Sequence, residues 1–254
     1  MKRTILAGAI AIATLAAGAS GLWAQKQPAP KSKGEQQALQ ALGAAQQKND
    51  PNEIIKAADD LITKYADTEF KEIALSMEAR AYQMKGDNIK AQIYAEQVLQ
   101  VNPNSLDATM LLGQLIAQSV GEHDLDREEK LAKAEKYLKQ AEDQLGPAPK
   151  PPLNEQQWKY SVSDVHSGLG MVAEARKKYD VAATEYKTAA DTAPDDKTFA
   201  ARYAHALQLG GKNDEAVAAC DKILDDKDVN PQIRGYVQNV RATAIKAGGK
   251  AAGK

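Results

Sequence analysis

The chain has 254 residues, which is enough for one or two globular domains or for one array of stacked repeats. Hydrophobic residues make up 43% of it and aromatic residues only 5%, a balance that suits close helix packing better than the core of a β-sandwich or barrel. With 33 basic and 34 acidic residues, the net charge of −1 gives no reason to expect binding to nucleic acid or to an acidic membrane surface. A single cysteine, Cys220, excludes an intramolecular disulfide framework and every multi-cysteine metal motif.

Residues 1–24 have the three-part layout of a bacterial secretory signal peptide. A Lys-Arg pair precedes a short apolar run rich in Ala and Gly, and Ala24 is a small residue at the expected cleavage site. The alternative is an uncleaved anchor, because residues 5–24 are about long enough to span a bilayer, although weakly apolar for that role. We therefore expect an exported protein, periplasmic or associated with the cell envelope, that touches the membrane only if this segment is retained.

Two irregular segments are expected to flank the fold. Residues 25–37 are predicted to form a flexible leader, because the stretch QKQPAPKSK has no apolar periodicity and contains two prolines. Residues 247–254, AGGKAAGK, are predicted to form a disordered tail. Neither segment offers a functional motif, and we interpret both as spacers.

Small residues recur at a spacing of 34 positions through most of the remaining chain. The series are Ala45, Ala79 and Gly113; Ala57 and Ala91; Gly170 and Ala204; and Ala182 and Ala216. The clearest stretch is 72–105, whose apolar pattern predicts two amphipathic helices. Gly86 and Asp87 separate these helices, since the glycine can end one helix and the aspartate can cap the next.

The pattern of residues 72–105 resembles the tetratricopeptide repeat (TPR). The matching positions are Leu75, Ala79, Tyr82, Gly86, Ala91, Val98 and Pro103. The family's 34-residue motif places small residues where its two helices cross most closely. The resemblance implies an all-α fold, a right-handed α-solenoid of helix-turn-helix repeats with about five units and a C-terminal capping helix. The units would cover 38–71, 72–105, 106–148, 163–196 and 197–230, followed by the cap at 231–246.

The largest departures from the repeat lie between the third and fourth units. About nine extra residues, GEHDLDREE, begin at Gly121, and a connector with four prolines in eight residues follows Leu145. Asn154 then predicts a helix start about two turns before the motif requires one. This early segment contains Trp158, a candidate special patch that could anchor a partner or merely cover the insertion or the connector.

The sequence offers no catalytic motif. It contains no Gly-rich phosphate loop, no paired metal-binding histidines and no nucleophile elbow, so we expect no enzyme, no cofactor and no metal. His123 lies among acidic residues that could hold a cation, but a solvated acidic loop before a helix is favoured. His166 is interpreted as a packing residue, and Cys220 as a buried, inert thiol.

In the family that the chain resembles, the first helix of each unit lines a concave groove. The candidate partner-binding positions here are Arg80, Gln83, Met110, Gln114, Met171, Glu174, His205 and Gln208. Such a groove would be mixed and polar, with Gln side chains able to donate and accept hydrogen bonds. The alternative for each position is a solvated residue on a helix face. Asp164 and Leu111 stand where a terminal-carboxylate clamp would need a base and an amide, which argues against that mode of binding.

Together these features predict a non-enzymatic interaction scaffold of the bacterial cell envelope that binds a protein or peptide segment in its groove. The alternative is a structural or oligomerising protein that its uncleaved N-terminal segment holds at the inner membrane. The mass of the mature chain separates the two, because cleavage after Ala24 removes the anchor.

Overall fold

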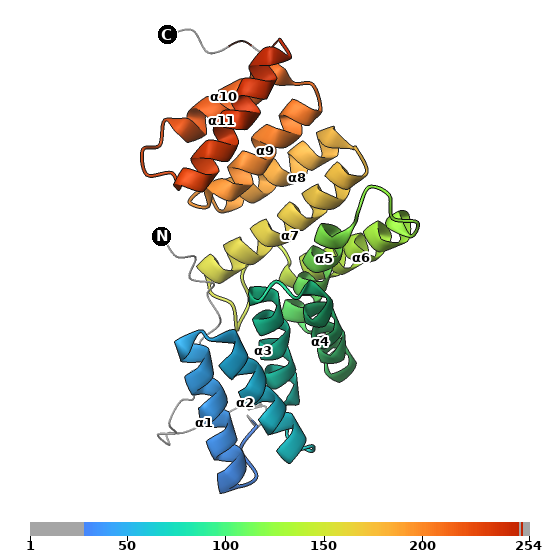
Figure 1. Cartoon of the computed structure of the whole chain (residues 1–254), viewed down its shortest axis with the longest axis vertical. Coiled ribbons are helices and arrows are strands. Elements are labelled where there is room, and N and C mark those ends of the chain that lie inside the picture. Colours follow the sequence, from blue (N-terminus) through green and yellow to red (C-terminus); the bar gives the residue numbers. More distant parts are fainter. Residues whose placement is uncertain (1–27, 249, 251–254) are drawn as a thin grey trace. The chain divides into compact units, whose positions relative to one another are not determined.

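A computed structural model describes residues 28–248 and residue 250, and all regular structure in this part of the chain is α-helical (Figure 1). The helices are α1 Lys33–Lys48, α2 Pro51–Lys64, α3 Lys71–Met84, α4 Asn88–Val101, α5 Leu106–Ser119, α6 Arg127–Leu145, α7 Glu155–Ala175, α8 Tyr179–Thr192, α9 Lys197–Leu209, α10 Asn213–Leu224 and α11 Pro231–Lys246. The predicted all-α, TPR-like solenoid is confirmed. The predicted signal peptide, 1–24, lies outside the described residues.

The chain divides into two compact units, the first ending at Asp87 and the second beginning at Asn88. In the first unit, α2 packs against both α1 and α3. In the second, each helix from α4 to α11 packs against its neighbour in the chain, and α7 and α9 also pack against the helices two positions away. Each helix therefore buries its apolar face against neighbouring helices, as expected for a stack of repeats.

Side-chain caps fix several helix starts. Asp50 accepts hydrogen bonds from the backbone N–H groups of Asn52 and Glu53, and Pro51 opens α2. At the start of α7, Asn154 and Gln157 each accept a hydrogen bond from the other's backbone N–H. These bonds satisfy N–H groups that have no partner within the helix. The early start of α7, predicted from Asn154, is therefore confirmed.

Glycines allow close helix crossings in the second unit. A Cβ atom added at Gly170 on α7 would lie 2.6 Å from the ring of Tyr186 on α8. Cβ atoms added at Gly113 on α5 and at Gly168 on α7 would each lie 2.6 Å from the side chain of Leu138 on α6. No side chain larger than hydrogen fits at these three positions without movement of a buried neighbour. Leu138 thus packs against two glycines on different helices.

The predicted flexible leader, residues 25–37, extends too far, because its last residues belong to helix α1. Helix α1 begins at Lys33, within the segment 25–37, and the hydroxyl of Ser32 accepts a hydrogen bond from the N–H of Glu35. The Glu35 carboxylate is buried; it accepts hydrogen bonds from the Thr68 hydroxyl at 2.6 Å and from the N–H of Lys31 at 2.6 Å. The start of α1 is therefore fixed in part by a contact with the loop between α2 and α3, which the local sequence pattern does not reveal.

The prediction that residues 247–254 are disordered also needs correction for Ala247 and Lys250, which form hydrogen bonds with α10. The carbonyl of Ala247 accepts a hydrogen bond from the Asn213 side chain at 3.1 Å. The N–H of Lys250 donates to the Asp214 carboxylate at 2.7 Å. The two contacts join Ala247 and Lys250 to the first turn of α10. Among the described helices, none is long and apolar enough to cross a membrane.

Candidate functional site

The second unit has a hollow of about 320 Å³ on the surface formed by α5, α7 and α9, here called the groove hollow. These are the first helices of the third, fourth and fifth predicted repeats. Its lining residues are Ala117, Gln118, Met171, Glu174, Ala175, Tyr186 and Arg202. Helix α8 contributes only Tyr186, whose ring is buried and packs against Gly170 while its hydroxyl reaches Glu174.

Charged and aromatic groups meet at the groove hollow. The Tyr186 hydroxyl donates to Oε2 of Glu174 at 3.2 Å, and the Arg202 guanidinium carbon lies 5.9 Å from the centre of the Tyr186 ring. Burial raises the pKa of Tyr186, so its hydroxyl stays neutral and remains a donor. The other carboxylate oxygen of Glu174 lies 3.9 Å from Nδ1 of His205. The His205 ring in turn meets the Tyr236 ring edge-on, with 5.7 Å between centres.

The structure brings together three of the eight predicted groove residues. Met171 and Glu174 line the groove hollow, and His205 lies beside Glu174. Gln114 on α5 donates from its amide to the carbonyl of Asp164 on α7 at 3.3 Å. Met110 packs against the apolar core that α5, α6 and α7 share. These last two side chains are thus used, at least in part, to join helices.

The remaining predicted residues are not part of the groove hollow. Gln208 is half-buried on α9. Arg80 and Gln83 are half-buried on α3, which belongs to the first unit and is described with it. Their role as partner-binding residues stays a prediction.

Sequence reasoning missed three residues of this site: Tyr186, Arg202 and Tyr236. Tyr186 is buried on α8, and only its hydroxyl reaches the site. Arg202 lies on α9 three residues before His205, which the repeat register does assign to the groove. Tyr236 belongs to the capping helix α11, where 42% of its surface is exposed. Its contact with His205 depends on how α11 packs against α9, which the repeat register does not give.

A second hollow, of about 330 Å³, lies between α6, the Pro-rich connector and α7, and is here called the Trp158 hollow. Its lining residues are Glu142, Leu145, Gly146, Pro147, Trp158, Val162, Val165 and His166. Five of these eight side chains are apolar, and the indole Nε1 of Trp158 is buried without a hydrogen-bond partner. Trp158 also packs against the core of α6 and α7, so it does line the junction of the third and fourth repeats.

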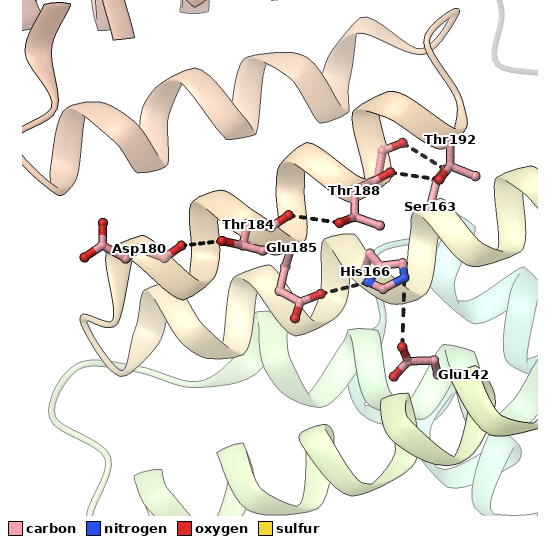
Figure 2. Close-up of polar contacts among 9 residues, drawn as sticks. Glu142, Ser163, His166, Asp180, Thr184, Glu185, Thr188 and Thr192 are labelled. Carbon is pink, nitrogen blue, oxygen red and sulfur yellow. Dashed lines mark hydrogen bonds and ion pairs between the residues drawn. The ribbon is translucent and has the colours of Figure 1, made fainter. Parts of the chain in front are cut away.

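His166 lies between two carboxylates at this hollow (Figure 2). Its Nδ1 is 2.7 Å from Oε2 of Glu185 on α8, and its Nε2 is 4.0 Å from Oε1 of Glu142 on α6. The hydrogen bond with Glu185 is the main cause that raises the pKa of His166 above its ordinary value, and the charge of Glu142 adds to it. The histidine is half-buried and joins three helices, in agreement with its interpretation as a packing residue.

Three threonines in Figure 2 bond within their own helix, whereas the Ser163 hydroxyl on α7 donates to the Ala189 carbonyl on α8 at 3.0 Å. Along α8, the hydroxyls of Thr184, Thr188 and Thr192 each donate to the carbonyl four residues earlier, at 2.8 to 3.1 Å. Such bonds satisfy the hydroxyls locally and offer nothing to a ligand.

The acidic insertion bonds to cations of the chain itself. Asp124 and Asp126 both pair with Lys130, at 3.0 and 2.9 Å, and Glu128 pairs with Arg176 at 2.6 Å. In the part of the chain that the structure describes, no group of three or more His, Cys, Asp or Glu residues could hold a metal ion. The loop thus packs back onto α6 and α7 through ion pairs.

Cys220 on α10 is fully buried, as predicted. Burial raises the pKa of its thiol to about 11, and the nearby Asp221 carboxylate adds to the shift. Because the thiolate is the reactive form, the predicted inertness of this cysteine is consistent with its surroundings.

No protein-family model matches the chain, and no curated protein matches it in sequence. Among solved structures it is similar to TTC0263, a thermophilic TPR protein of Thermus thermophilus, with 18% identity over 81% of this chain and 98% of that one, at a TM-score of 0.58. It is also similar to the MamA protein, with 17% identity over 75% of this chain and 90% of that one, at a TM-score of 0.56. The chain therefore has the tetratricopeptide repeat fold.

Proposed function

We propose that the chain is a non-enzymatic interaction scaffold that binds a protein segment at the groove hollow. The observation that supports this most is the meeting of Glu174, Arg202 and Tyr186 at one hollow on the first helices of three successive repeats. An extended peptide offers N–H donors for the carboxylate and carbonyl acceptors for the guanidinium, while the buried Tyr186 holds Glu174 in place through its hydroxyl. Arginine is also one of the residue types that contribute most often to binding energy at protein interfaces.

The groove hollow has room for side chains of a protein segment. Its volume of about 320 Å³ lies at the lower end of the range for ligand pockets, which is about 300 to 1,000 Å³. Met171 and Ala117 give it apolar walls for one or two side chains. The rest of a bound segment would lie along α7 and α9, where His205 and Tyr236 offer further contacts.

Site-specific cross-linking tests this proposal. A photo-cross-linking residue at Gln118, which is exposed and lines the groove hollow, should capture a discrete partner in the native host. The matched control is the same residue at the exposed Lys187 on α8, and Arg202→Ala should remove the Gln118 adduct. Adducts that are the same at both positions would overturn the proposal. An adduct with a second copy of the chain would favour the oligomerising alternative.

We further propose that the scaffold works in the cell envelope after export directed by residues 1–24. The Lys-Arg start and the short Ala-rich run support this assignment. The intact mass of the protein from the native host tests it. A chain that starts at Gln25 supports export with cleavage, whereas a full-length chain in the membrane fraction supports the anchored alternative.

A further inference from the structure

The Trp158 hollow is built from the parts of the chain that the repeat does not require. Gly146 and Pro147 come from the Pro-rich connector, and Trp158 and Val162 come from the two extra turns at the start of α7. Leu145 is the last residue of the lengthened helix α6. A regular 34-residue repeat lacks these segments, so the repeat fold alone does not produce the Trp158 hollow.

We propose that the Trp158 hollow binds one large apolar side chain, such as Leu or Phe, of an uncharged peptide segment. The apolar walls of Leu145, Val162 and Val165 select the side chain, and the polar groups at the edge match a peptide backbone. This site shares no lining residue with the groove hollow, so the inference does not rest on the function proposed above.

The charges around the hollow favour a neutral occupant. His166 already lies between the carboxylates of Glu185 and Glu142, which offset its positive charge. The Lys150 ammonium lies near the lining residue Gly146, 3.1 Å from where a Cβ atom of this glycine would stand. With both signs present at the edge, a ligand cation or anion gains from one group and loses from the other.

Two polar groups provide the contacts that a peptide backbone needs. Glu142 is half exposed at the edge of the hollow and can accept a hydrogen bond from a peptide N–H. The buried N–H of Trp158 has no acceptor, and an unpaired buried donor is costly. In the proposed complex, this N–H would donate to a carbonyl of the bound peptide.

The test uses the full chain with Trp23→Phe, so that Trp158 is the only tryptophan and gives one indole N–H signal in a ¹H–¹⁵N spectrum. N-acetyl-leucinamide is the probe, since it combines an apolar side chain with two amides. A probe of this size should bind with a dissociation constant in the low millimolar range. We expect a saturable shift of the indole signal with this probe and no shift with N-acetyl-glycinamide, which lacks the side chain.

Variants locate the binding. Val162→Phe places a ring in the wall of the hollow, narrows it and should abolish the saturable shift, whereas Val181→Phe, at an exposed position on α8, should leave it unchanged. If Val162→Phe does not fold by circular dichroism, Glu142→Ala provides the test and should weaken binding about fivefold through one lost hydrogen bond. The proposal is overturned if the leucine probe causes no saturable shift at a few tens of millimolar, if Val162→Phe folds and still binds it, or if N-acetyl-lysinamide binds more tightly.

Discussion

Glu78 on α3 and His166 on α7 are two ionisable side chains at packing positions of two different repeats. Glu78 is fully buried, and no N–H or O–H group of another residue donates to its carboxyl oxygens. Burial, and secondly the nearby Asp59, raise its pKa to about 9. The pKa of His166 is raised chiefly by its hydrogen bond with Glu185. Both groups hold their proton more tightly in the folded protein. For Glu78 the reason is that the folded state disfavours the charged carboxylate, and for His166 it is that the folded state favours the charged imidazolium.

The repeat register explains why the two sites differ. Glu78 stands 34 residues before Leu112, at a position that Leu169 occupies in the fourth repeat. Both leucines are buried, so Glu78 places a carboxyl at a position where the other repeats bury an apolar side chain. His166 lies at a junction with carboxylates on α6 and α8. A solenoid packing position thus accepts an ionisable group either in its neutral form or with a partner from the next helix.

The substitution Glu78→Leu should have the largest effect on stability. Between the ordinary pKa of 4.5 and the raised value of about 9, the folded protein keeps a proton that the unfolded chain releases. Each pH unit in this window therefore lowers the free energy of unfolding by up to about 1.4 kcal/mol. We expect Glu78→Leu to stabilise the protein by several kcal/mol at pH 8 in urea titrations. Glu78→Gln should remove the same pH dependence, and a loss of stability in Glu78→Leu would contradict the assignment.

The substitution Glu185→Gln should have the next largest effect, with the opposite sign. Because the folded pKa of His166 is raised above 6.5, the pair stabilises the protein fully below pH 6.5 and loses its contribution as the pH rises through the folded pKa. We expect Glu185→Gln to cost about 1 to 2 kcal/mol at pH 6 and much less at pH 8.5. An NMR titration of His166 should show its pKa falling in the variant. An unchanged pKa would mean that Glu185 is not the main cause.

The substitution Asp59→Asn should have a smaller effect on the same buried carboxyl as Glu78→Leu. Asp59 is the second cause of the raised pKa of Glu78, after burial. Removing its charge should lower that pKa and stabilise the protein at pH 8 by less than Glu78→Leu does. Urea titrations of both single variants and the double variant should show that Asp59→Asn has no effect once Glu78 is leucine. Additive effects would show that Asp59 acts elsewhere.

The smallest effect is expected where charge is solvated. Lys187 and Asp191 form an ion pair one turn apart on α8, with side chains 55% and 66% exposed. Since exposed pairs contribute little to stability, Lys187→Ala should leave the midpoint of urea unfolding unchanged at pH 6 and pH 8. A shift as large as that of Glu185→Gln would show that this exposed ion pair contributes as much to stability as the pair of His166 and Glu185.

The sequence predicts the fold better than it predicts the sites. The spacing of 34 residues correctly placed Gly170 and Gly113 among the small positions, because a neighbouring helix crosses closely at each, with Tyr186 and Leu138 as the contacts. The start of α1 was missed, since Glu35 is fixed by Thr68, 33 residues away. Arg202 was missed because the repeat spacing gives its position on α9 but not the direction of its side chain, which decides whether it reaches the groove hollow. Glu78 could have been found, because a carboxyl in the register of Leu112 is visible in the sequence alone.

The packing of Leu138 affects where the second unit can bend. Its side chain fills the space between Gly113 on α5 and Gly168 on α7, where no additional carbon atom fits. A bend between the third and fourth repeats would have to compress this contact, whereas a bend elsewhere among the described helices of the unit meets no such double glycine contact. We therefore expect the second unit to bend unevenly, stiffest at the junction that also forms the Trp158 hollow, so that the hollow keeps its shape while the repeats on either side move.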